Sequence, residues 1–256
     1  MRHLTPALPP LALTAVLLLV WEVACRRLAI PVYFLPPPTA VVQALIDNGP
    51  VLAGSALQTF WMAFKALVVA VGLGGGLAVL VSLNRFAERA IAPLAVTLQV
   101  TPVVAIAPLV LIWVGLDHAD RAVTALAAAV AFFPVFSGVL TGLKATDPDL
   151  ERLFDLHNAT AVQRLWRLRL PSCLPFALEG IRVASGLAII GAVVAEFVSG
   201  SGATQGLAWR LLEAGNRLRT ADLLAALVCL AVMGLALNAA ATAARQYGLR
   251  HRDGHL

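Results

Sequence analysis

Apolar residues run through this chain in unbroken stretches of membrane-crossing length, and this feature restricts the fold more than any other. A membrane-spanning helix needs ~20 consecutive, mostly apolar residues, whereas a membrane β-strand alternates over ~10 residues. The chain is 60% hydrophobic and 13% charged, and an ordinary soluble domain is ~25% charged. We therefore expect an all-α membrane protein with about six transmembrane helices. The expected helices cover residues 9–28, 57–82, 91–115, 121–143, 176–198 and 221–244.

The first apolar run also permits other interpretations. Residues 8–24 have the length of a signal peptide, and residues 22–25 weakly resemble a lipoprotein cleavage site. Glu22 and the two arginines after Cys25 fit both interpretations poorly. We expect an uncleaved first membrane helix.

Charge and cysteine usage exclude several classes of site. The net charge of +5 fits loop charges that set membrane topology better than a nucleic-acid surface, so no nucleic-acid partner is expected. The three cysteines lie far apart without metal-ligand spacing, and we expect no disulfide framework, metal site or cofactor. The cluster Gly72, Gly74, Gly75 and Gly76 lacks a following Gly-Lys-Ser/Thr, so it predicts close helix packing or a flexible point rather than a phosphate loop.

The placement of Lys and Arg predicts the orientation, because cytoplasmic loops carry an excess of these residues. The bias favours both termini in the cytoplasm. The expected cytoplasmic cations are Arg2, Arg85, Arg89, Lys144, Arg152, Arg164, Arg167, Arg169, Arg245, Arg250 and Arg252. The expected outer cations are Arg26, Arg27, Arg121, Arg210, Arg217 and Arg219.

The chain reads as one domain over residues 1–256, because no long linker or repeat interrupts it. Between the first two membrane helices, Pro36–Pro38 cannot continue a helix. Thr39 is a reasonable N-cap, and residues 39–47 predict a short helix at the outer surface.

A polar segment at residues 144–175 interrupts the apolar pattern. Asp147 is expected to cap a short helix that has Pro148 in its first turn. Asn158 stands where that helix should end, because asparagine tolerates the left-handed conformation of a helix exit.

A second short helix follows in the same segment. Thr160 and Gln163 have the spacing of a capping box. This helix is expected to stop before Pro171. Two interpretations remain open: a basic loop on lipid headgroups, or a rigid helix–turn–helix that docks onto a cytoplasmic partner.

The residues around this segment carry a family resemblance. Asp-Pro-Asp-Leu (147–150), Leu-Pro-x-x-Leu-Pro (170–175) and the run from Gly180 to Phe197 resemble the EAA loop of ATP-binding-cassette (ABC) importer permeases. Residues 34–45, 99–115 and 132–148 extend the resemblance in the same order. The chain is most similar to the subgroup importing nitrate, aliphatic sulfonates, taurine, and pyrimidine-type or riboflavin-type vitamin compounds.

The resemblance implies a type I ABC importer permease fold with cytoplasmic coupling helices between helices four and five. It implies a bacterial inner-membrane protein that pairs with a second copy, a separate ABC ATPase subunit and an extracytoplasmic substrate-binding protein. A chain without a phosphate loop should not hydrolyse ATP itself. The residues expected to dock the ATPase are Asp147, Asn158, Ala159, Thr160, Gln163, Arg164, Arg167 and Pro171.

The chain departs from the family pattern within this loop. Arg152, Leu153 and Phe154 stand where the family usually has Glu-Ala-Ala, and Asn158 stands where it has glycine. The bulky side chains predict a differently shaped socket on the ATPase, or a weakened partnership.

Polar residues and prolines within the apolar runs mark candidates for the translocation path. Pro102, Pro108 and Pro134 are expected to break backbone hydrogen bonds, which membrane helices tolerate where neighbours or water satisfy the freed groups. Gln99, Thr101 and Pro102 are path candidates on this ground. Glu196 is a further candidate, at the expected outer end of helix five beside the glycine-rich residues 199–206.

Two rival functions stay open on the sequence alone. A secondary transporter would use its buried charges for ion coupling, and inverted repeats would favour it. A membrane scaffold would not transport at all. Neither rival accounts for a docking element.

Overall fold

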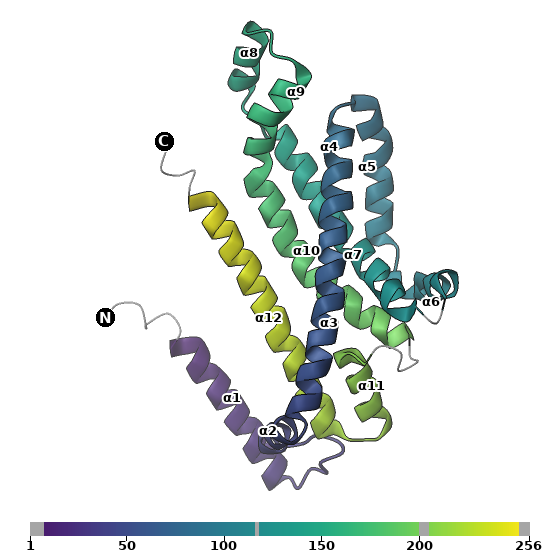
Figure 1. Ribbon diagram of the computed structural model, residues 1–256. Coiled ribbons are helices and arrows are strands. Elements are labelled where there is room, and N and C mark those ends of the chain that lie inside the picture. Colours follow the sequence, from purple (N-terminus) through teal and green to yellow (C-terminus); the bar gives the residue numbers. More distant parts are fainter. Residues whose placement is uncertain (1–7, 116–117, 200–204, 251–256) are drawn as a thin grey trace. The chain divides into compact units, whose positions relative to one another are not determined.

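The computed structural model describes residues 8–115, 118–199 and 205–250, and all regular structure in these ranges is helical (Figure 1). Helices satisfy every backbone donor and acceptor internally, which a lipid environment requires. Four helices in the described ranges are long and apolar enough to cross a membrane, and they are Gly49–Ser82, Ala119–Lys144, Ala161–Ser199 and Thr220–Tyr247. The prediction of an all-α membrane protein is confirmed.

The chain forms two compact units. Residues 1–57 and 205–231 make the first unit, and residues 58–204 and 232–256 make the second. The long helices α3 (Gly49–Ala70) and α12 (Thr220–Arg250) each contribute to both units.

The first unit holds α1, α2, α11 and the first parts of α3 and α12. The bounds of the three short members are α1 Leu8–Arg27, α2 Pro38–Asp47 and α11 Leu207–Asn216. Thr39 is not the N-cap of α2, because the helix begins one residue earlier with Pro37 at the cap position. The backbone N–H and hydroxyl of Thr39 instead donate to the carboxylate of Glu22, at 3.1 and 3.0 Å. Helix α11 was not predicted.

The second unit carries most of the apolar core. After α3 it contains η1 Val71–Gly75, α4 Gly76–Ser82, α5 Arg85–Val100, α6 Val103–Val114, α7 Ala119–Lys144, α8 Pro148–Leu156, α9 Ala161–Arg164, η3 Leu165–Arg169 and α10 Leu170–Ser199. The elements η1 and η3 are π-helical turns that continue the helices on either side of them.

Helices α7 and α10 pack backbone against backbone, because glycines line their contact. A Cβ placed on Gly180 would lie 2.6 Å from the carbonyl oxygen of Pro134, and one on Gly138 would lie 2.8 Å from that of Phe176. A Cβ on Gly191 would lie 2.8 Å from the Cα of Ala127. Small residues allow such close approach, which stabilises helix pairs in membranes through van der Waals contact.

The predicted third membrane helix, residues 91–115, is two helices rather than one. Helix α5 ends at Val100, Thr101 and Pro102 are extended, and α6 begins at Val103. Pro102 causes this break, because proline disfavours the helical conformation of the residue before it. Pro108 and Pro134 instead lie inside α6 and α7, so neither ends a helix.

The prediction that a helix stops before Pro171 is wrong. The chain is helical from Ala161 to Ser199, with Pro171 in the first turn of α10. The π-helical turn η3 ends at Arg169, two residues before the proline. A π-turn widens the helix and relieves the clash between a proline ring and the carbonyl of the preceding turn.

The glycine cluster in α3–α4 contributes less packing than predicted. Of its four members only Gly74 approaches a neighbour, since a Cβ there would lie 3.0 Å from the carbonyl oxygen of Phe132. Gly72, Gly75 and Gly76 have open space around their Cα atoms. The π-helical turn η1 falls at this cluster.

Candidate functional site: the segment between α7 and α10

Helix α8 begins as the sequence predicts. The Asp147 carboxylate accepts a hydrogen bond from the backbone N–H of Asp149 at 2.8 Å, and Pro148 is the first helical residue. This cap satisfies one of the N–H groups that lack a partner at a helix start.

The turn between α8 and α9 also follows the prediction. Asn158 has a φ of 49°, the left-handed conformation that ends many helices. The N–H of Ala159 donates to the carbonyl of Phe154 at 3.0 Å, which closes the turn. Thr160 and Gln163 form a complete capping box, with hydrogen bonds of 3.3 and 2.9 Å in the two directions.

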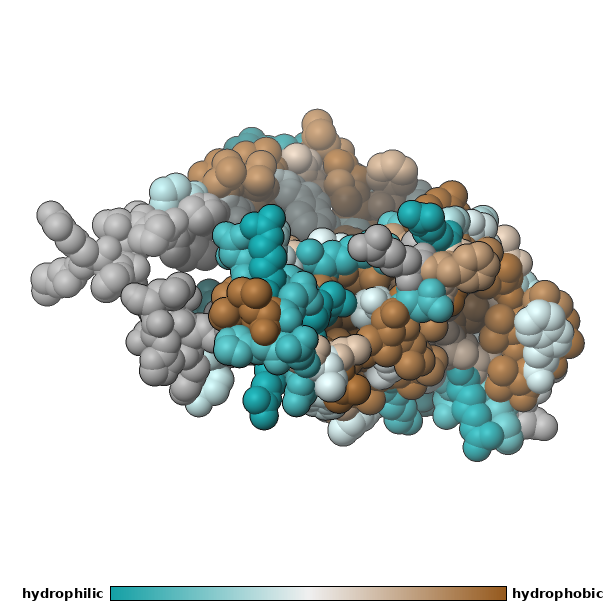
Figure 2. Space-filling view, turned by 90° about the horizontal axis from the view of Figure 1, so that it is seen from above, coloured by the Kyte–Doolittle hydropathy of each residue, from teal (hydrophilic) through white to brown (hydrophobic). Residues whose placement is uncertain are grey.

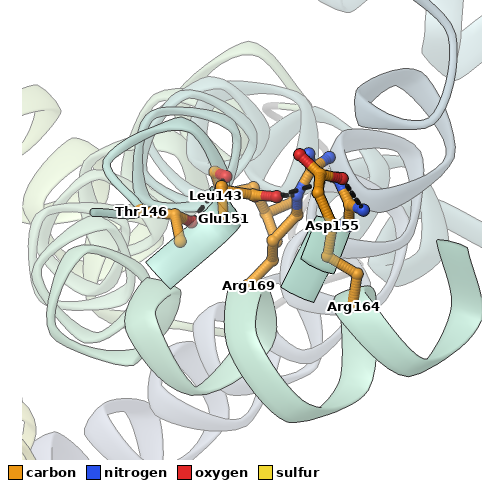
Figure 3. A network of polar contacts seen from close by, with 6 residues as sticks. All are labelled: Leu143, Thr146, Glu151, Asp155, Arg164 and Arg169. Carbon is orange, nitrogen blue, oxygen red and sulfur yellow. Dashed lines mark hydrogen bonds and ion pairs between the residues drawn. The ribbon is translucent and has the colours of Figure 1, made fainter. Parts of the chain in front are cut away.

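A network of ion pairs joins α8 to the helix that follows the turn (Figure 3). Glu151 accepts from Arg164 at 3.2 Å and from Arg169 at 2.7 Å. Arg164 also donates to Asp155. The side chains of Glu151 and Arg164 are 21% and 22% exposed, so water screens the pair only in part. This network joins the two helices through three ion pairs.

Arg164 lies outside the apolar part of its helix. The helix Ala161–Ser199 has 39 residues, and a membrane crossing needs only ~20. The three arginines of this helix's first turns precede its apolar part. The hydrogen bond to Asp155 is the main cause that raises the pKa of Arg164 above its ordinary value.

The opposite face of the segment is hollowed. A depression of about 310 Å³ is lined by Leu153, Phe154, His157, Ala159, Gln163 and Arg167. Figure 2 looks onto this end of the molecule, where hydrophilic residues gather over α8 and α9. Arg167 forms no ion pair with any residue that the structure describes. The docking candidates therefore differ in their partners: Arg164 pairs with Glu151 and Asp155 and lines a separate hollow of about 300 Å³, whereas Arg167 lines the depression.

The base of the segment is tied to the membrane helices. Lys144, at the end of α7, forms an ion pair with Glu88 near the start of α5. The Thr146 hydroxyl donates to the Leu143 carbonyl at 3.3 Å and holds the exit from α7 (Figure 3). Helices α8 and α9 thus lie in the chain directly between the end of α7 and the start of α10.

The path candidates fall at two separate places. Gln99, near the end of α5, and Pro102 are exposed, and Thr101 lines a cavity of about 340 Å³. This cavity lies between α3, η1, α6 and α7, and its other lining residues are apolar. Glu196 does not line it.

Glu196 is a buried carboxylate near the end of α10. It is 1% exposed and accepts a hydrogen bond of 2.9 Å from the hydroxyl of Thr59, which is itself fully buried. Thr59 belongs to α3, so this bond joins α3 to α10 within the second unit. The glycine-rich residues 200–204 beside it lie outside the described residues.

Comparison with known proteins now identifies the chain. Residues 70–248 match the family described as binding-protein-dependent transport system inner membrane component. The chain belongs to this family. It is a multi-pass inner-membrane permease of the ABC importer class, a family whose members are not themselves catalytic.

Curated relatives of this permease match along most of their length. It is 36% identical over 211 residues to the formylaminopyrimidine transport permease protein of Halalkalibacterium halodurans, covering 82% of each chain. It is 29% identical over 233 residues to the taurine transport system permease protein of Escherichia coli, covering 88% of this chain and 82% of the relative.

A solved structure confirms the fold of this permease. The crystal structure of an amino acid ABC transporter with histidines matches with a TM-score of 0.67, covering 80% of this chain and 97% of that chain. The two sequences are 13% identical, so the likeness concerns the fold alone.

Sequence reasoning missed the Glu151–Arg169 pair and the glycines of the α7–α10 contact. The charge pattern held a signal for the network, since Glu151 and Asp155 are four residues apart on one helix face and three arginines follow the turn. Nothing in the local sequence marks the glycines, because only the packing of two distant segments brings them together.

Proposed function

We propose that the segment of residues 144–175 docks this permease onto a separate ABC ATPase subunit and transmits the motion of that ATPase to the membrane helices. The observation that carries this proposal is the ion-pair network of Glu151, Asp155, Arg164 and Arg169, which ties α8 to the helix after the turn through three ion pairs. A rigid element between two membrane helices passes displacement on, whereas a loose loop absorbs it.

The docking surface would be the depression on the other face of this body. Leu153, Phe154, His157 and Arg167 border it, and Asn158 and Ala159 form the adjoining turn. Leu153 and Phe154 occupy places where the family usually has alanine. We propose that the ATPase partner has a correspondingly wider socket.

The translocation path would run between two copies of this permease. Helix α5 ends at Val100, before the extended residues Thr101 and Pro102, and backbone groups freed by such a break are not left facing lipid. Exposed Gln99 beside the break supports a face covered by a second copy or by water. A homodimer is the simplest assembly that supplies this cover.

Both termini would lie in the cytoplasm, with an extracytoplasmic binding protein delivering cargo on the other side. The distribution of Lys and Arg supports this orientation, since it places the arginines of residues 164–169 on the cytoplasmic side. A reporter fused after Arg245 should be active only in the cytoplasm. A reporter there that is active outside the cell would overturn both the orientation and the docking proposal.

The cargo would be a small solute. Relatives are named for formylaminopyrimidine, taurine and nitrate, and we propose cargo of comparable size for this chain. Purified permease should show no ATPase activity in the absence of other subunits. Hydrolysis by a preparation shown free of them would contradict this.

The decisive experiment changes the turn and measures ATPase binding. Asn158→Pro forces φ to about −65° at a residue whose φ is 49°, and it should abolish co-purification of the ATPase and uptake into vesicles. Thr160→Ala removes one cap bond and should do the same more mildly, since such a loss costs ~0.5–2 kcal/mol.

If the segment is instead a basic loop that lies on lipid headgroups, the opposite results are expected. Replacing Arg164, Arg167 and Arg169 together would then release the segment from the membrane surface, and the turn variants would have no effect. If Asn158→Pro retains normal ATPase binding and uptake while the segment of the triple variant is released from the membrane surface, the docking proposal is wrong.

A further inference from the structure

A lysine lies within an apolar membrane helix, and no acidic residue that the structure describes forms an ion pair with it. Helix Gly49–Ser82 has 34 residues, so every stretch of ~20 residues that it places across a membrane includes Lys65. Lys65 is exposed, and no ion pair joins it to any described residue. An ionisable side chain in a membrane span faces protein or water rather than lipid, because lipid exposure costs ~2.5–3.5 kcal/mol on insertion scales.

Lys65 stands at one end of a groove between α3 and α7. Its part of the groove, about 380 Å³, is lined also by Val69, Asp120, Arg121 and Thr124. Arg121 is exposed and, within the part of the chain that the structure describes, unpaired like Lys65. Among the described residues that line this end of the groove, two cations, Lys65 and Arg121, stand against one carboxylate, Asp120.

The other end of the groove is apolar. Val69 and Ala125 line both the charged part and the cavity of about 340 Å³ beside Thr101, so the two hollows share a wall. From there Leu73, Ile106 and Phe132 continue the lining. The hydroxyl of Thr101 is the one polar side chain, and it donates to the carbonyl of Thr97 at 2.8 Å.

We infer that this groove is the cargo site and that the cargo is an organic anion with a compact apolar body. The inference rests on the proposed function. The anionic group lies at Lys65 and Arg121, and the body packs against Val69, Ala125 and Phe132. A charge-assisted hydrogen bond to a lysine strengthens where water is scarce, so the anion supplies the partner that Lys65 lacks.

A second hollow supports anionic cargo independently. In the first unit, a hollow of about 250 Å³ is lined by Arg210, Arg217 and Arg219 against the carboxylates of Glu213 and Asp222. The sequence places these arginines and Arg121 on the outer side of the membrane. Cationic side chains gathered in hollows raise the local concentration of anions.

The test measures binding to the full-length permease in phosphatidylcholine nanodiscs by calorimetry. Three probes separate the parts of the cargo: hexanesulfonate carries body and charge, hexanol the body alone, and nitrate the charge alone. Hexanesulfonate should bind at least about tenfold more tightly than either of the others. Equal binding of hexanol would overturn the inference.

Variants then assign the site. Lys65→Gln should weaken the binding of hexanesulfonate by about tenfold and leave the binding of hexanol unchanged. Lys65→Arg should restore most of the affinity for hexanesulfonate. Ala125→Leu should narrow the groove, weakening hexanesulfonate and leaving nitrate unaffected. The matched control is Arg152→Gln. Arg152 is an exposed arginine of α8, and its replacement should leave the affinity for all three probes unchanged. Hexanesulfonate that binds Lys65→Gln as tightly as the wild type would refute the site.

A lipid arm separates cargo from membrane lipid. Nanodiscs containing phosphatidylglycerol are analysed by native mass spectrometry for retained lipid. Phosphatidylglycerol held by the wild type and lost in Lys65→Gln would make the groove a lipid site and overturn the inference. Co-purification of an ATPase is scored on the same wild-type sample. A permease that binds the ATPase but not hexanesulfonate refutes this inference alone, and one that binds no ATPase refutes the proposed function.

Discussion

The contact between α7 and α10 should not tolerate even one added methyl group. Gly180→Ala would place a Cβ 2.6 Å from the carbonyl oxygen of Pro134 and 3.4 Å from the Cα of Gly138. Both atoms belong to the backbone, so no side chain can rotate away, and the two helices must separate. Overpacking of this kind costs ~1–3 kcal/mol.

The same helix offers a matched control. Gly186 also lies in α10, but nothing lies within 4 Å of a Cβ placed there. Gly186→Ala should therefore be neutral or stabilise the helix by up to ~1 kcal/mol, because alanine restricts the unfolded backbone more than glycine does.

The assay is thermal unfolding of the purified permease, followed as loss of the monodisperse peak after heating. Gly180→Ala should lower the apparent Tm by roughly 2–12 °C, the range that corresponds to ~1–3 kcal/mol at this chain length. Gly138→Ala should behave similarly, since its Cβ would lie 2.8 Å from the carbonyl oxygen of Phe176. The apparent Tm of the double variant should fall by less than the sum of the two single decreases, because once the helices separate both methyl groups are accommodated.

Equal Tm values for Gly180→Ala and Gly186→Ala would refute the reasoning. Backbone contact would then not limit the approach of α7 to α10. A stability loss in both variants would point instead to a general intolerance of substitution in α10.

Three further outcomes follow from the described contacts. Glu151→Gln weakens two ion pairs and should loosen α8, raising the rate of protease cleavage near the turn by up to about thirtyfold at ~1 kcal/mol per pair, whereas Arg152→Gln should leave that rate unchanged. Glu196→Leu should lower the apparent Tm through loss of a hydrogen bond worth ~1.5–3 kcal/mol, and Glu196→Gln, which keeps an acceptor for Thr59, should lose about half as much; equal losses would contradict the role of that bond. Thr160→Ala should destabilise the segment locally without changing global Tm, as hydrogen exchange at residues 158–164 would report, and a global loss would show that the capping box supports more than its own helix.

Local features of this permease can be predicted from the sequence because their physical causes are local. A lipid environment admits helices whose backbone is satisfied internally, so apolar runs of sufficient length fix the class of protein. The Asp147 cap, the left-handed Asn158 and the capping box of Thr160 and Gln163 appear as predicted, since each is decided within four residues. The break at Pro102 follows from the constraint that proline places on its neighbour.

Features that depend on contacts between distant segments of the chain were decided only by the tertiary structure. The sequence favoured a helix stop at Pro171. The helix instead continues through Pro171, it packs against α7, and the π-helical turn η3 lies just before the proline. Gly180 matters because Pro134 lies against it, whereas Gly186, in the same helix, faces open space. The sequence around Arg164 predicts a cation available for docking, but in the structure Glu151 and Asp155 pair with it across the turn. Contacts between residues far apart in the chain depend on how helices pack, and packing is settled by the shape and volume of all the facing side chains together.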